Sequence, residues 1–200
     1  RNEISVLNES ERKNLQNHLV NNLNNTNIGI LLTMYSGMRI GEICALKWSD
    51  IDLQSGIIRI SKTVQRINDK IGNSKTKIIV GSPKSRTSER EIPIPNFLVN
   101  ILNERRQNEN NYILSGTHKL IEPRTMQNRF KSVLKKCGIR NVNFHLLRHT
   151  YATVCIENGF DAKTVSELLG HSNVNITLNR YVHSSLDTKK KYVEKLNFVA

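Results

Sequence analysis

Between residues 57 and 94, short β-rich runs interrupt a chain that otherwise shows helical periodicity. The runs are Ile57–Ile60, Lys77–Val80 and Arg90–Ile94, and the polar, glycine-containing stretch 68–74 separates the first two. Helical patterns precede and follow this region. The sequence therefore predicts one α+β domain over residues 1–200, mainly helical, with a small antiparallel sheet on one flank.

Local signals mark where the helices should begin and end. Asn8 with Glu11 three positions later forms an N-terminal capping signal, and Pro123 suits a first helical turn. Gly138, Gly159 and Gly170 follow periodic segments at positions where a helix should stop. The first helix should run from Asn8 to the Asn-rich segment 21–27, and the others should span about 28–35, 39–48, 96–107, 123–136, 145–158, 162–169, 175–181 and 186–196.

The charge balance suggests a polyanionic partner. Thirty Lys and Arg residues against 17 Asp and Glu residues give a formal net charge of +13, which favours nucleic acid over an anionic membrane surface. The same residues could also simply solvate the surface. A hydrophobic share of 38% argues against intrinsic disorder, and no apolar stretch approaches the ~18 residues of a membrane span. No signal peptide opens the chain, and its first residue is Arg1, so we expect a fragment of a longer protein.

The cysteines argue against a disulfide framework or a zinc site. Cys44, Cys137 and Cys155 are odd in number, far apart and outside any C-x-x-C pair. Cys44 and Cys155 lie within apolar patterns, so we expect them to be small core residues in a reducing compartment.

The segment 36–42 (SGMRIGE) has an arginine between two glycines at a helix start. Arg39 would then present its guanidinium beside free backbone N–H groups, an arrangement that suits a phosphate. Glu42 lies three positions on, on the same helix face, and could orient Arg39. For this segment alone, a surface ion pair after a turn is the favoured explanation.

The segment 144–153 (FHLLRHTYAT) combines histidines with an arginine. His145 and Arg148 share a helix face and could supply a proton carrier and a cation to one oxyanion. His145 and His149 also have metal-binding spacing, but Leu146 stands where H-E-x-x-H requires Glu, so His149 is expected to cap or pack. The segment 168–172 (LLGHS) then places His171 after a helix-ending glycine, ten residues before Tyr181.

Taken together, these segments resemble the tyrosine recombinase (integrase) family. The matching motifs are GMRIGEICALKWSDID, HLLRHTYAT, LLGHS and the tyrosine that follows, in order and spacing. The resemblance covers essentially the whole chain as the C-terminal catalytic domain. It implies DNA cleavage and rejoining through a 3′-phosphotyrosyl intermediate with no metal or other cofactor, for integration or excision of a phage or mobile element.

The resemblance also implies a role for each matching residue. Tyr181 would be the nucleophile, and Arg39 and Arg148 would hold the non-bridging phosphate oxygens. His145 would transfer a proton with the nucleophile, and His171 would hydrogen-bond the phosphate, while Glu42 would support the arginine.

The family also uses a lysine on a β-hairpin loop to protonate the leaving 5′-oxygen. Lys84 in the segment SPKSRT, just before the run Arg90–Ile94, matches this position, and Lys75 and Lys77 are the alternatives. Each lysine could instead contact phosphate or solvent.

The same resemblance sets expectations about partners and alternatives. It implies double-stranded attachment-site DNA, a homotetramer in the synaptic complex, an excisionase or DNA-bending accessory protein, and a bacterial cytoplasmic setting. The family's N-terminal DNA-clamping domain is not found in this sequence, so we expect weak DNA binding. A type IB topoisomerase or a non-catalytic DNA-binding regulator of the same fold are the alternatives; the LLGHS motif and the complete catalytic set favour the recombinase.

Overall fold

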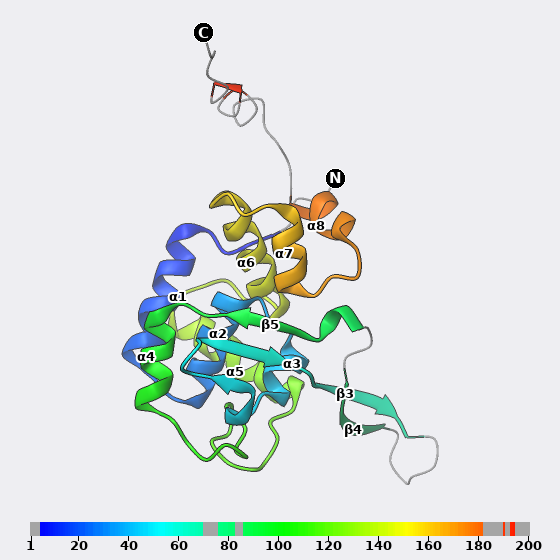
Figure 1. Ribbon diagram of the computed structural model, residues 1–200. Coiled ribbons are helices and arrows are strands. Elements are labelled where there is room, and N and C mark those ends of the chain that lie inside the picture. The colour runs from blue at the N-terminus through cyan, green and yellow to red at the C-terminus, as the bar shows by residue number, and fades with distance from the viewer. Residues whose placement is uncertain (1–4, 70–75, 83–85, 182–189, 191–192, 195–200) are drawn as a thin grey trace.

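The computed structural model describes residues 5–69, 76–82, 86–181, 190, 193 and 194. Helices surround a small antiparallel sheet, and a β-hairpin projects from this body (Figure 1). The α-helices are α1 (Glu9–Asn21), α2 (Asn25–Ser36), α3 (Ile40–Ala45), α4 (Asn96–Glu104), α5 (Pro123–Lys136), α6 (His145–Glu157), α7 (Ala162–Leu169) and α8 (Val174–Tyr181). The predicted α+β class is confirmed.

The predicted helix signals act as expected. Asn8 caps α1, and its reciprocal hydrogen bonds with Glu11 complete a capping box. Pro123 is the first residue of α5. Gly138, Gly159 and Gly170 all have positive φ. A glycine adopts this left-handed backbone without the clash that a Cβ atom would introduce, which explains why the helices stop there.

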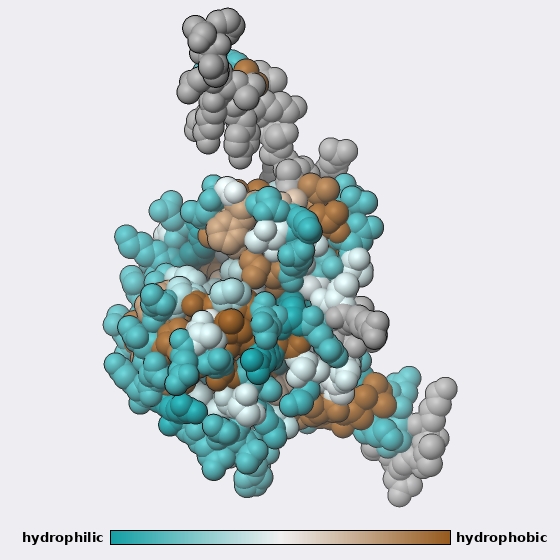
Figure 2. Space-filling model, viewed as in Figure 1, coloured by the Kyte–Doolittle hydropathy of each residue, from teal (hydrophilic) through white to brown (hydrophobic). Residues whose placement is uncertain are grey.

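The strands form two separate units instead of the one sheet that we expected. β1 (Ile51–Asp52), β2 (Ile57–Ile60) and β5 (Arg90–Pro93) form an antiparallel sheet in the order β1-β2-β5. Among the strands that the structure describes, β3 (Thr63–Asn68) pairs with β4 (Thr76–Gly81) alone, and β4 contains the predicted run Lys77–Val80. The hairpin surface is more apolar than most of the face in view (Figure 2), and Ile79 and Val80 are exposed on β4.

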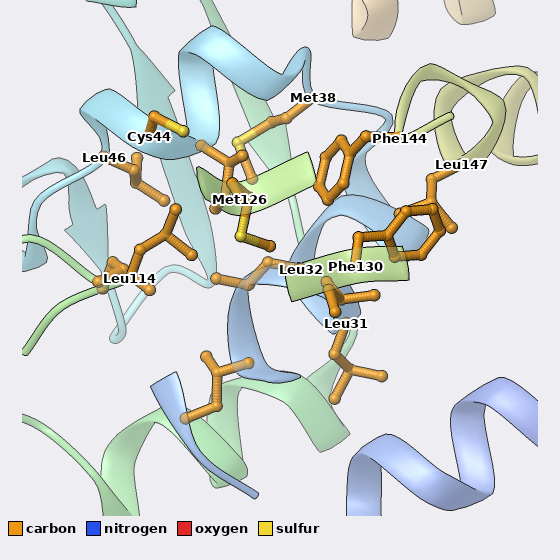
Figure 3. Packing of buried hydrophobic residues seen from close by; sticks show 14 of the residues in the cluster. Leu31, Leu32, Met38, Cys44, Leu46, Leu114, Met126, Phe130, Phe144 and Leu147 are labelled. Atoms are coloured by element: carbon orange, nitrogen blue, oxygen red, sulfur yellow. The ribbon is translucent and has the colours of Figure 1, made fainter. Parts of the chain in front are cut away.

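The main core lies where α2, α3 and α5 meet. Ile30, Leu31 and Leu32 of α2 are fully buried, so this helix has almost no solvent-facing side in its middle turn. Phe130 and Phe144 pack edge to face, with ring centroids 5.2 Å apart (Figure 3). A second, smaller cluster contains Ala152, Cys155, Val165, Leu169 and Tyr181.

Some predicted boundaries were wrong. The helix expected over 39–48 ends at Ala45 and is followed by a 3₁₀ turn, Trp48–Asp50, and the helix expected to reach residue 107 ends at Glu104. The helix predicted over 186–196 lies almost entirely outside the described residues. None of the described helices is long and apolar enough to cross a membrane. Cys44 and Cys155 are buried, as predicted.

Candidate active site

Arg39 is held at the start of α3 by Glu42. Its backbone N–H and its Nη1 donate to the two Glu42 carboxylate oxygens, each at 2.8 Å. The Glu42 side chain is only 2% exposed, whereas that of Arg39 is 36% exposed. The alternative of a surface ion pair is therefore wrong for Glu42, because its carboxylate is buried. Arg39 keeps an accessible side and can meet a ligand.

A second arginine, Arg90 on β5, shares the same carboxylate. Its Nη1 and Nη2 donate to Glu42 Oε1 and Oε2 at 3.0 and 2.9 Å, and its side chain is 6% exposed. Burial raises the pKa of Glu42, but the hydrogen bonds and charges of Arg90 and Arg39 outweigh it and hold the pKa below its usual value. Glu42 is thus ionised at neutral pH. Our sequence reasoning missed Arg90, because no local pattern distinguishes it from other strand arginines.

Arg148 on α6 is buried among backbone carbonyls. Its Nη1 donates to the Gly37 carbonyl at 2.9 Å and its Nη2 to the Leu169 carbonyl at 2.7 Å. Burial, together with the nearby charge of Arg39, lowers the pKa of Arg148 to about 9, which still leaves the guanidinium protonated at neutral pH. The site therefore keeps two fixed positive charges, on Arg39 and Arg148.

The C-terminal end of α7 joins three arginines. The carbonyls of Leu168, Leu169 and Gly170 accept hydrogen bonds from Arg90 Nε, Arg148 Nη2 and Arg39 Nη2, respectively. The last carbonyls of a helix lack partners within the helix and carry its negative partial charge. This helix end is thus a natural acceptor for the guanidinium groups, and it gathers side chains from α3, β5 and α6 in one place.

Tyr181 is the last residue of α8 and is 8% exposed. Its Oη lies 2.5 Å from Nδ1 of His149, which is half-buried on α6. His149 packs against neighbouring rings, as expected, and its imidazole also contacts the tyrosine hydroxyl, which we did not expect. His145 is exposed one turn earlier, and its ring meets that of His149 edge to face at 4.5 Å.

His171 follows the end of α7 and faces α8. Its Nδ1 lies 2.9 Å from Oγ1 of the buried Thr177, so α8 sets the orientation of the imidazole ring. Among the residues that the structure describes, there is no group of three or more His, Cys, Asp or Glu that could hold a metal ion.

The lysine candidates are only partly described. Lys84 and Lys75 lie outside the described residues. Lys77 is exposed on β4, and its Nζ lies 3.6 Å from Asp69 Oδ1. The assignment of Lys84 stays a prediction.

Comparison with known proteins gives the family. The model of the phage integrase family matches residues 5–187, and the chain therefore belongs to this family. A tyrosine recombinase XerC-like protein of Caldanaerobacter subterraneus subsp. tengcongensis is 36% identical over 186 residues, which cover 84% of this chain and 48% of that protein. Tyrosine recombinase XerA of Thermococcus onnurineus is 30% identical over 85% of this chain and 55% of its own length. The chain thus spans about half the length of these curated relatives.

Solved structures share the fold. The Tn1549 transposon integrase in complex with transposon right end DNA superposes with a TM-score of 0.77 at 20% identity, covering 98% of this chain and 66% of that one. The catalytic domain of bacteriophage HP1 integrase gives a TM-score of 0.62 at 19% identity and covers 99% of this chain and all of that one. The predicted resemblance is confirmed: the chain has the tyrosine recombinase catalytic-domain fold.

Proposed function

We propose that the chain is the catalytic part of a site-specific DNA recombinase that cleaves and rejoins DNA through a 3′-phosphotyrosyl bond to Tyr181. The observation that carries the proposal is the convergence of Tyr181, Arg148 and Arg39. Arg39 and Arg148 both donate to the end of α7, and Tyr181 packs in the same buried cluster as Leu169, whose carbonyl accepts from Arg148. A nucleophile beside two fixed cations is the arrangement that attack on a phosphodiester requires.

The assigned roles follow from this arrangement. Arg39 and Arg148 would neutralise the charge that develops on the non-bridging oxygens, and the buried Glu42–Arg90 pair would keep Arg39 in place. His171, oriented by Thr177, would hydrogen-bond the phosphate, and His145 would belong to the proton-transfer chain of the nucleophile.

Double-stranded DNA is the proposed substrate. The net charge of +13 supports it, as do two related structures: the Tn1549 integrase is bound to transposon right end DNA, and XerH site-specific recombinase is bound to its difH substrate. We expect strand exchange to need four protomers on paired sites, with accessory DNA-bending proteins, in the cytoplasm of a bacterial host. A mobile-element role is supported by 25% identity to the transposase of transposon Tn916 from Enterococcus faecalis over 84% of this chain.

The Tyr181→Phe variant tests the nucleophile. The substrate is a pool of nicked duplexes of randomised sequence, in which cleavage releases a short strand and so blocks rejoining. The wild-type chain should form a covalent adduct with this pool, visible on a denaturing gel. Tyr181→Phe should form none, because it lacks the attacking oxygen, and Tyr112→Phe should react normally. An adduct in the Tyr181 variant would assign the attack to another residue.

The Lys84→Ala variant tests the proposed general acid. It should slow cleavage of ordinary DNA by roughly 10²–10⁴-fold, the usual contribution of a positioned acid. A substrate with sulfur in place of the bridging 5′-oxygen should restore the rate, because a thiolate leaves without a proton. Lys77→Ala is the matched control and should cleave both substrates normally. If sulfur does not rescue Lys84→Ala, that lysine is not the acid.

A further inference from the structure

We propose that His149 receives the phenolic proton of Tyr181 when this residue attacks phosphorus. The inference deepens the proposed function, on which it rests. The family resemblance assigns this proton transfer to His145, the first histidine of the segment HLLRH. The structure instead points to His149, the second histidine.

The contact itself is the first argument. The distance of 2.5 Å between His149 Nδ1 and Tyr181 Oη is at the short end of hydrogen bonding. The two groups reach each other from different elements, α6 and α8, which also contact each other directly. When Nδ1 carries no proton, Tyr181 donates the hydrogen bond and His149 accepts it, so the acceptor is already aligned with the proton that must leave.

The second argument is the change in burial along the rings of Tyr181, His149 and His145. Tyr181 is 8% exposed, His149 is half-buried, and His145 is exposed at the surface with its ring against that of His149. A buried phenol releases its proton to bulk water poorly, whereas an adjacent imidazole offers an acceptor within hydrogen-bond reach as the attack proceeds. The three rings therefore form a graded path from the nucleophile towards solvent, in which His149 makes the direct contact and His145 lies behind it.

The cleavage step needs no reactant besides the DNA, Tyr181, His149 and the general acid. The Tyr181 Oη–P bond forms as the P–O5′ bond breaks, the phenolic proton moves to His149 Nδ1, and the leaving 5′-oxygen takes a proton from the general acid. In the reverse step, a 5′-hydroxyl attacks phosphorus and gives its proton back to the general acid, the Oη–P bond breaks, and Tyr181 recovers its proton from His149. Arg148, whose Nη1 and Nη2 donate to backbone carbonyls, takes no part in proton transfer, because its guanidinium stays protonated.

Adduct formation with the nicked duplex pool separates proton transfer from positioning. His149→Gln can still hydrogen-bond Tyr181 but cannot accept its proton, and His149→Ala does neither. We expect both variants to form adduct roughly 10²–10⁴-fold more slowly than wild type while binding DNA equally well in gel shifts. Free imidazole should restore part of the rate to His149→Ala, and His118→Ala, at an exposed site, should behave as wild type. A wild-type rate in His149→Gln overturns the inference.

A nuclear magnetic resonance measurement tests the contact without DNA. The ¹⁵N resonance of His149 Nδ1 should shift in Tyr181→Phe, because its hydrogen-bond partner is removed, while that of His118 should not. An unchanged His149 resonance overturns the inference even when the wild-type chain forms adduct. If the wild-type chain forms no adduct although this resonance shifts, the proposed function has failed and the contact has not, so the two failures are distinguishable.

Discussion

At the scale of residues, the site depends on one buried carboxylate shared by two arginines. Glu42 receives the backbone N–H and Nη1 of Arg39 and both terminal nitrogens of Arg90, so each carboxylate oxygen has two donors. A buried charge is tolerated only when it is paired and fully hydrogen-bonded. This pairing explains how an ionised glutamate can stand 2% exposed under the phosphate-binding surface that we propose.

The Arg90→Met variant tests this dependence. It leaves Glu42 buried with half of its donors, and we expect the free energy of unfolding to fall by about 3 kcal/mol, as in other broken buried pairs. Arg59→Met is the matched control in the neighbouring strand, because its ion pair with Glu91 is 66% and 59% exposed. That change should cost less than about 1 kcal/mol in the same urea titration. Equal losses in the two variants would contradict the argument.

At the scale of elements, the C-terminal end of α7 organises the site. Its last carbonyls bind Arg90, Arg148 and Arg39, and the left-handed Gly170 turns the chain so that His171 meets α8. Thr177, six residues after His171, holds the imidazole of His171, and α8 then ends at Tyr181. The spacing from His171 to Tyr181 is thus the length of one turn and one short helix.

Replacing Gly170 should damage both stability and chemistry. A Cβ there would lie 2.9 Å from the Thr87 carbonyl oxygen, whereas at Gly138, with φ equally near 65°, it would meet nothing within 4 Å. Gly138→Ala should cost about 1 kcal/mol for the left-handed backbone alone. Gly170→Ala should cost a further ~2 kcal/mol for the forced shift, measured by urea unfolding.

Adduct formation provides the second readout for this pair. It should fall in Gly170→Ala, because the shift moves the carbonyl that holds Arg39, and it should be unchanged in Gly138→Ala. Normal chemistry in Gly170→Ala would show that the helix end does not position the arginines.

At the scale of the whole molecule, the basic charge has two uses. Three arginines are committed to the site through Glu42 and α7, and we propose that other basic residues among the 30 meet DNA phosphates. Contacts between basic side chains and DNA phosphates weaken as salt rises, because each such contact releases a condensed counterion.

DNA affinity should therefore fall steeply with salt. We expect the logarithm of the association constant to fall by about 0.9 per tenfold rise in salt for every phosphate neutralised. Fluorescence anisotropy with a labelled duplex measures this slope, and a duplex with uncharged methylphosphonate linkages is the control that should show almost none. A flat response with ordinary DNA would contradict an electrostatic role for the basic surface.

Features with local causes could be predicted from the sequence, and those with distant causes could not. Asn8 and Gly170 mark helix ends through their own side chain or backbone. In contrast, β3 has only one fully buried side chain, Val64, and its polar sequence gives little sign of a strand until β4 pairs with it. Arg90 was missed for the same reason: its carboxylate partner lies 48 positions away.

From the sequence we could predict the α+β class, several helix ends and, through four motifs in order, the family and a set of candidate site residues. The folded structure was needed to show that Glu42 is buried, that Arg90 shares its carboxylate, and that His149 contacts the tyrosine. A motif shows which side chains share one face of a helix or turn, because local backbone geometry sets their spacing. Which of two neighbouring histidines meets Tyr181 depends on how α8 packs against α6, and 32 positions of intervening chain separate the two residues.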